Sequence, residues 1–218
     1  KSTSIDPSVV DADGVYRHVG PARVFTTERD AIAAVKGTSR THPPIQPGDV
    51  LVLAGRGPMG SGMEETAQIT IALKHQDWGK HVPIITDARF SGVSTGACVG
   101  HVSPEALADG PIGKLRDGDR VRIVIDRVNL AASIDFVGEA DGPDLSADDA
   151  ADLLARRTLH PTIQPDPRLP YDTRLWAALQ QARGGKWDGA VYDVDRIVEA
   201  LAAHAPADSP SRDHSMID

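Results

Sequence analysis

The chain has 218 residues, 25% of them charged, and a formal net charge of −8 at pH 7. This length supports one large domain or one domain with an extension, and the interspersed charges exclude a basic stripe that would bind nucleic acid. Cys98 is the single cysteine, which excludes an internal disulfide framework and a metal cage built from cysteines.

No apolar run approaches the length of a membrane span, and no charged leader precedes an apolar segment. We therefore expect a cytoplasmic protein. The chain starts at Lys1 instead of methionine, and we expect it to be a fragment of a longer protein whose N-terminal domain is absent.

The first third of the chain shows strand and helix signals in turn. Short apolar stretches alternate with Asp, Gly and Pro over residues 1–25, which predicts short edge or barrel strands. Thr26 or Thr27 is expected to cap a helix that ends at Gly37. Residues 49–54 form a continuous apolar run, typical of a strand buried on both faces.

Two polar loops follow apolar runs. The first loop, residues 55–65, is rich in glycine, and the spacing of Ser61 and Glu64 is that of a capping box, which predicts a helix starting at Ser61. Its first turn would offer N–H groups to an anion. The second loop begins after Ile84 and Ile85, a predicted buried strand, and carries Ser91.

The rest of the chain divides into a strand pair and a helical region. Pro104 is expected at the first position of a short helix, residues 121–126 alternate as a strand does, and residues 130–137 are expected to pair with it. From about residue 142 the sequence predicts three helices: one from Ser146 to Arg157, one capped by Asp172 or Thr173, and one with an apolar stripe from Val194. We expect residues 205–218 to be mobile.

Four blocks occur in one order: Gly-Ser-Gly-Met-Glu-Glu at 60–65, Ile-Thr-Asp-Ala-Arg-Phe-Ser-Gly at 85–92, Gly-His-Val-Ser-Pro-Glu-Ala at 100–106, and Gly-Pro-Ile-Gly-Lys-Leu-Arg-Asp-Gly-Asp at 110–119. They resemble the C-terminal domain of the dihydroxy-acid and phosphogluconate dehydratase family, which includes aldonic acid dehydratases. The resemblance covers roughly the first two thirds of the chain.

The resemblance implies an α/β fold: a swivelling β-barrel-like domain over residues 1–142, flanked by helices, and a helical extension and tail over 143–218. It also implies a dehydratase that converts a 2,3-dihydroxy acid to a 2-keto-3-deoxy acid, with Mg²⁺ and an iron–sulfur cluster, [2Fe–2S] or [4Fe–4S]. The missing N-terminal domain would hold the cluster, so no cluster ligand is expected in this chain. The fragment alone would be inactive, and the whole protein a homo-oligomer.

The resemblance assigns roles to several residues. Ser91 would be the base that removes the C2 proton, although by itself it is more readily a turn hydroxyl. Glu65 would ligate Mg²⁺, although Glu64 or Glu65 could simply complement a helix dipole. Ser94, Thr95 and Arg89 would bind substrate; Arg89 could equally pair with Asp87. His101 is expected to be structural, and Cys98 a small core residue.

Three other functions stay open. Ala88, residues 93–95 and the helical extension favour an aldonic acid over the branched-chain dihydroxy acid, but a dihydroxy-acid dehydratase remains an alternative. A non-catalytic swivelling module for binding or assembly is another. A phosphate-binding loop at 55–62 is weaker, because it lacks the Lys-Ser/Thr ending of a P-loop.

Overall fold

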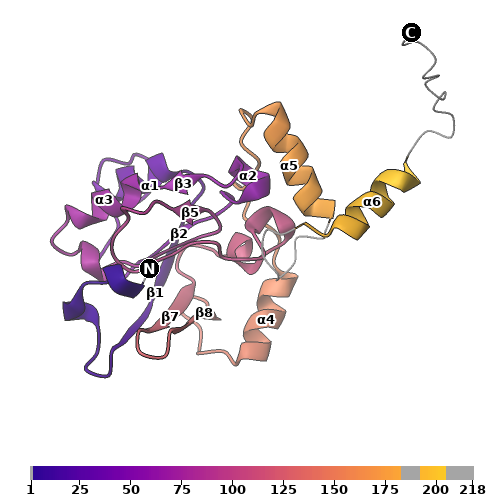
Figure 1. The fold of residues 1–218 in the computed structure, drawn as a ribbon. Helices are drawn as coiled ribbons and strands as arrows, with labels where there is room; N and C mark the ends of the chain where they lie inside the picture. Colours follow the sequence, from indigo (N-terminus) through magenta and orange to yellow (C-terminus); the bar gives the residue numbers. More distant parts are fainter. Residues whose placement is uncertain (1, 183–191, 205–218) are drawn as a thin grey trace, which may run out of the picture.

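A mixed six-stranded sheet organises the chain, as the computed structural model in Figure 1 shows for residues 2–182 and 192–204. The strand order is β6-β4-β2-β1-β7-β8, and the predicted α/β class is confirmed. The strands are β1 Val15–Phe25, β2 Val50–Leu53, β4 Ile84–Thr86, β6 Cys98–Val99, β7 Arg120–Asp126 and β8 Ala131–Gly138. A separate two-stranded sheet pairs β3, Glu65–Thr66, with β5, Arg89–Phe90.

Short and long helices surround the sheets. The α-helices are α1 Glu28–Val35, α2 Pro58–Ser61, α3 Gln68–Lys74, α4 Ala147–Arg156, α5 Tyr171–Ala182 and α6 Val194–Ala203. Single 3₁₀ turns lie at Ser2–Ser4, Pro7–Val9, Gly79–His81, Ala106–Ala108 and Pro111–Lys114. Within the described residues, no helix is long and apolar enough to cross a membrane.

The prediction of short edge or barrel strands over residues 1–25 is wrong in the length of the strand and in the edge position. β1 is one strand of 11 residues in the interior of the sheet, parallel to β2 and antiparallel to β7. Gly20 does not end it; the glycine lets a neighbouring turn approach, because a Cβ there would lie 1.9 Å from the carbonyl oxygen of Gly48. Pairing on both sides therefore overrides the local turn signals.

The helix predicted from Ser61 is also absent. Ser61 Oγ accepts the N–H of Glu64 at 3.0 Å, as a cap would, but Gly62 and Met63 both have positive φ values, of 70° and 65°. The chain therefore turns into β3, and α3 begins only at Gln68. Its first N–H groups are capped from a distance by Glu28, whose Oε1 accepts from Ala67 and Ile69.

Other predictions hold with small shifts. Thr27 caps α1, β2 is buried along its length, β7 and β8 pair, and Ser146 caps α4. α5 starts at Tyr171, just before the expected caps. The helix expected at Pro104 is instead a 3₁₀ turn starting at Ala106, whose N–H donates to the Asp87 carboxylate. The tail 205–218 lies outside the described residues.

The alternation of β2 divides the core between the two faces of the sheet. Val50 and Val52 belong to one buried cluster, which includes Leu154 of α4. Leu51 and Leu53 belong to the other, which packs under α1 and α3. Because α4 shares the first cluster, it is part of the main core, while the domain boundary at residue 142 stays a prediction.

Candidate active site

The small β3–β5 sheet brings two of the predicted site residues together. Glu65 and Arg89 are partners in its parallel register, and Arg89 Nη1 lies 3.3 Å from Glu65 Oε2. Both side chains are about half exposed, at 51% for Arg89 and 46% for Glu65. The alternative pairing of Arg89 with Asp87 is not the ion pair formed here.

Ser91 follows β5 directly and extends the same pairing. Its N–H donates to the carbonyl of Thr66 at 2.9 Å, so the backbone continues in register for one more residue. Beyond this hydrogen bond the chain turns, since the Ser94 N–H donates to the Ser91 carbonyl at 3.1 Å. The half-buried Ser91 therefore lies at the end of the small sheet, two residues after Arg89.

The other two predicted substrate-binding residues lie differently. Ser94 is 2% exposed, and its Oγ donates to the Thr66 carbonyl at 3.3 Å, which braces the loop after Ser91. Thr95 is exposed and lines a cavity of about 550 Å³ together with the N-terminal segment and the end of α3. Their contact with substrate stays a prediction.

Asp87 holds together the backbone of the loops around the site, a role that was not predicted from the sequence. Its carboxylate, 2% exposed, accepts the N–H groups of Gly55, Arg56 and Ala106 at 2.9–3.0 Å. Burial raises the pKa of Asp87, and the three N–H donors oppose this shift. The signal in the sequence was a charged residue directly after the strand that ends at Thr86.

Glu105 performs a similar task beside it. Both of its carboxylate oxygens lie 3.1 Å from the N–H of Met59 in α2. Burial raises the pKa of Glu105 to about 7, and the nearby charge of Asp87 adds to the shift. The side chains of Asp87 and Glu105 therefore hold the glycine-rich loop at residues 55–60 against β4 and against the 3₁₀ turn at Ala106–Ala108.

His101, in the same sequence block as Glu105, has an exposed side chain, and its backbone N–H donates to the Ala88 carbonyl at 2.8 Å.

Arg56 connects this loop to the C-terminal region. Its guanidinium is 14% exposed, forms an ion pair with Glu64, and lies 4.0 Å from Asp166. The backbone N–H of Asp166 donates to the carbonyl of Gly60 at 2.7 Å. The segment before α5 is therefore attached directly to the loop that leads into Glu65.

The residues fit one part of the expected cofactor set. Among the described residues, no group of three or more His, Cys, Asp or Glu side chains is arranged to hold a metal. The half-exposed Glu65 carboxylate suits one ligand position of Mg²⁺, a cation that binds oxygen and keeps other ligands from water or substrate. Cys98 is 1% exposed in β6 and cannot alone hold an iron–sulfur cluster, which takes several cysteines.

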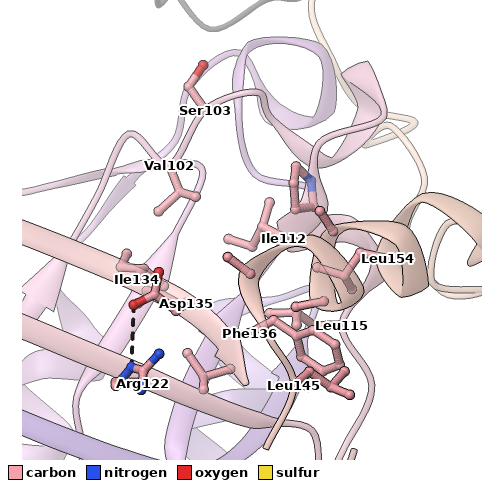
Figure 2. Close-up of a pocket in the computed structure, with 16 residues that line it drawn as sticks. Val102, Ser103, Ile112, Leu115, Arg122, Ile134, Asp135, Phe136, Leu145 and Leu154 are labelled. Atoms are coloured by element: carbon pink, nitrogen blue, oxygen red, sulfur yellow. Dashed lines mark ion pairs between the residues drawn. The ribbon is translucent and has the colours of Figure 1, made fainter. Parts of the chain in front are cut away.

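An apolar cavity lies away from these residues. It has a volume of about 400 Å³ and lies between β7, β8 and α4. Figure 2 shows Ile112, Phe136 and Leu154 around it, with the Arg122–Asp135 ion pair on the sheet beside them. None of Glu65, Arg89 and Ser91 lines this cavity.

The sequence is similar to known dehydratases over most of its length. Residues 3–164 match the family model described as dihydroxy-acid/6-phosphogluconate dehydratase C-terminal. Two relatives from Escherichia coli (strain K12) are the D-xylonate dehydratases YagF, 57% identical over 203 residues, and YjhG, 54% identical over 202 residues. These matches cover 93% and 92% of this chain and 30% of each relative.

A dihydroxy-acid dehydratase from Bordetella bronchiseptica is 41% identical over 161 residues, 73% of this chain and 25% of the relative. The chain thus spans less than a third of the length of these relatives.

Proposed function

Because the chain belongs to the dihydroxy-acid/6-phosphogluconate dehydratase family, we propose that it is the C-terminal part of an enzyme that removes water from a sugar acid. The substrate is a 2,3-dihydroxy acid of the D-xylonate kind, and the product is a 2-keto-3-deoxy acid. The observation that carries this proposal is the 57% identity to a D-xylonate dehydratase over 93% of the chain.

The arrangement around β3 and β5 supports the chemistry. Elimination requires a base for the C2 proton and a positive environment for the carboxylate and C2 oxygen, since negative charge develops there as the proton leaves. Ser91 is the proposed base, and Arg89, two residues before it and paired with Glu65, is proposed to contribute positive charge. The C3 hydroxyl departs as water, and the resulting enol tautomerises to the 2-keto acid.

Glu65 is proposed as the chain's Mg²⁺ ligand. A bound Mg²⁺ would supply positive charge at the substrate carboxylate and favour the alkoxide form of a nearby hydroxyl. Glu65 holds this position through its backbone register with Arg89, and its carboxylate is half exposed. An iron–sulfur cluster does not fit this chain, so the proposal places its ligands, and the remaining Mg²⁺ ligands, outside residues 1–218.

The assembly and location are further parts of the proposal. Val194, Val198 and Leu201 on α6 are each at least 59% exposed, which suits a face that is covered in a homo-oligomer. The N-terminal part of the longer protein would complete the active site. A cytoplasmic location agrees with the single cysteine, which can form no disulfide within the chain.

Dehydration assays on the full-length protein with Mg²⁺ and reconstituted cluster test this function. We expect 2-keto acid formation from D-xylonate and little from a branched dihydroxy acid, whereas the reverse preference would favour a dihydroxy-acid dehydratase. Ser91→Ala should lower kcat about a hundredfold or more, while Ser133→Ala, at an exposed serine of β8, should not. Absence of dehydration with every sugar acid and every branched dihydroxy acid would refute the enzyme function and leave a binding module.

A further inference from the structure

A small cavity lies between α2 and α5, at the junction of the glycine-rich loop and the helical extension. It has a volume of about 300 Å³ and is lined by Gly62, Asp172, Thr173 and Trp176. Figure 1 shows α5 standing beside α2, and the two helices are in contact. The residues that line it have no place in the proposed proton transfer or in Mg²⁺ binding.

The cavity is close in sequence to the proposed catalytic region, because Gly62, which lines it, is followed three residues later by Glu65. Gly62 contacts Thr173, since a Cβ at Gly62 would lie 2.5 Å from Thr173 Cγ2. The next residue, Met63, accepts from Arg89 Nε through its carbonyl at 3.2 Å. Arg89 in turn pairs with Glu65. These contacts connect α5 to Arg89 and Glu65 through Gly62 and Met63.

The segment before α5 fixes this helix in place. Ile163 packs on Gly55, where a Cβ would lie 2.8 Å from Ile163 Cγ2. Leu169, which is 8% exposed, packs against Gly62, where a Cβ would lie 3.5 Å from Leu169 Cδ2. Together with the Asp166 to Gly60 backbone hydrogen bond, these contacts give the wall of the cavity a defined position relative to the loop.

The side chains in the wall suit a polyol. A carboxylate and a hydroxyl can exchange hydrogen bonds with substrate hydroxyl groups, and an indole offers a flat apolar face for the C–H groups between them. The cavity is an open depression at the surface with a volume of about 300 Å³. It suits the distal end of a short-chain sugar acid whose reacting carbons lie elsewhere.

The family model and the matches to the two D-xylonate dehydratases extend over different parts of the chain. The family model ends at residue 164, before α5. The matches to the two D-xylonate dehydratases cover 93% and 92% of this chain, so they include α5, which ends at Ala182. The helix therefore lies within the region matched by the two D-xylonate dehydratases and beyond the residues matched by the family model.

From these observations we infer that Asp172, Thr173 and Trp176 form the specificity subsite for the distal hydroxyl groups of the sugar-acid substrate. This inference rests on the proposed function, because it assumes that a sugar acid reacts at the Ser91 and Glu65 region. In this arrangement the common domain carries the chemistry, and the helical extension selects the length and hydroxylation of the substrate.

The test compares conservative variants of the full-length, cofactor-loaded protein with D-xylonate as the probe. Thr173→Val keeps the methyl group that contacts Gly62 and removes the hydroxyl, and Asp172→Asn removes only the charge. Each should raise KM for D-xylonate about tenfold with kcat within about twofold, the effect of losing one hydrogen bond to the bound substrate. Asp152→Asn, the same change at an exposed position of α4, is the matched control and should leave both constants unchanged.

The possible results distinguish a failure of the subsite from a failure of the proposed dehydratase function. If the wild-type protein dehydrates D-xylonate and both variants retain its KM, the subsite is refuted while the proposed function stands. A fall in kcat at constant KM in both variants would also refute the subsite, because it would indicate that α5 only positions the catalytic loop. If the wild-type protein dehydrates no sugar acid, the proposed function itself fails, and the subsite with it.

Discussion

Glu65 and Arg89 lie opposite each other in the β3–β5 register, and Arg89 Nη1 is 3.3 Å from Glu65 Oε2. The two residues are far apart in sequence, and a sheet of only two short strands holds them together. Arg89 also donates through Nε to the carbonyl of Met63 at 3.2 Å. One arginine thus ties the proposed metal ligand to the loop that leads into it.

Replacing the proposed Mg²⁺ ligand should weaken metal binding. In the full-length protein, Glu65→Gln keeps the size of the side chain and removes its charge, so we expect the Kd for Mg²⁺ to rise about tenfold or more. Titration calorimetry with Mg²⁺ measures this directly, without relying on turnover. Glu199→Gln, at an exposed position of α6, is the control. Equal Mg²⁺ affinities of Glu65→Gln and wild type would remove Glu65 from the metal site.

Loss of the Asp87 carboxylate should destabilise the fold. Asp87→Ala would leave the N–H groups of Gly55, Arg56 and Ala106 without their acceptor, and we expect a loss of about 3 kcal/mol in the free energy of unfolding. Urea denaturation measures the change. Asp141→Ala, at an exposed turn position, should cost less than about 0.5 kcal/mol. A similar small effect at Asp87 would contradict its role as the anchor of the loop.

Glu105 should make stability depend on pH in the acidic range. Its pKa in the folded protein is raised to about 7 from an ordinary value of 4.5, so the folded state retains a proton that the unfolded state has released. Its stabilising contribution is therefore complete below about pH 4.5 and is lost as the pH rises to about 7. Over that interval wild type should lose on the order of 2 kcal/mol relative to Glu105→Gln.

Denaturant unfolding of both proteins at several pH values checks this expectation. Gln retains a carbonyl oxygen that can accept from the Met59 N–H but does not titrate. The difference between the two proteins therefore isolates Glu105 from other ionisable groups. A difference that stays constant between pH 4.5 and 7 would be incompatible with the raised pKa.

Gly62 tests the contact between the loop and α5. Gly62→Ala introduces a Cβ at a positive φ of 70°, and that atom would lie 2.5 Å from Thr173 Cγ2. Gly37→Ala is a close control, since Gly37 has a φ of 66° and nothing within 4 Å of the added Cβ. Both variants bear the backbone strain, about 1 kcal/mol, and only Gly62→Ala also displaces α5.

Thermal or urea unfolding should therefore show Gly62→Ala to be less stable than Gly37→Ala by a further 1–2 kcal/mol or so. Adding Thr173→Ala to Gly62→Ala should recover part of this difference, because it removes the methyl group that clashes. Equal losses in the two glycine variants would show that α5 does not press on Gly62.

Local sequence determined much of this protein. The all-apolar run of β2, the alternation of β7 and the Thr27 and Ser146 caps could each be recognised without coordinates, because burial periodicity and capping depend on neighbouring residues. The blocks around Glu65 and Ser91 were recognised instead by their resemblance to the dehydratase family.

Tertiary structure alone decided the features that depend on distant partners. β1 became an interior strand because it pairs on both sides, and α3 took its cap from Glu28 on another element. Contacts between segments that are remote in sequence position the carboxylates of Asp87 and Glu105 and form the cavity between α2 and α5. A local pattern does not identify the partners in such contacts, because the free energy that stabilises them depends on which segments the folded chain brings together.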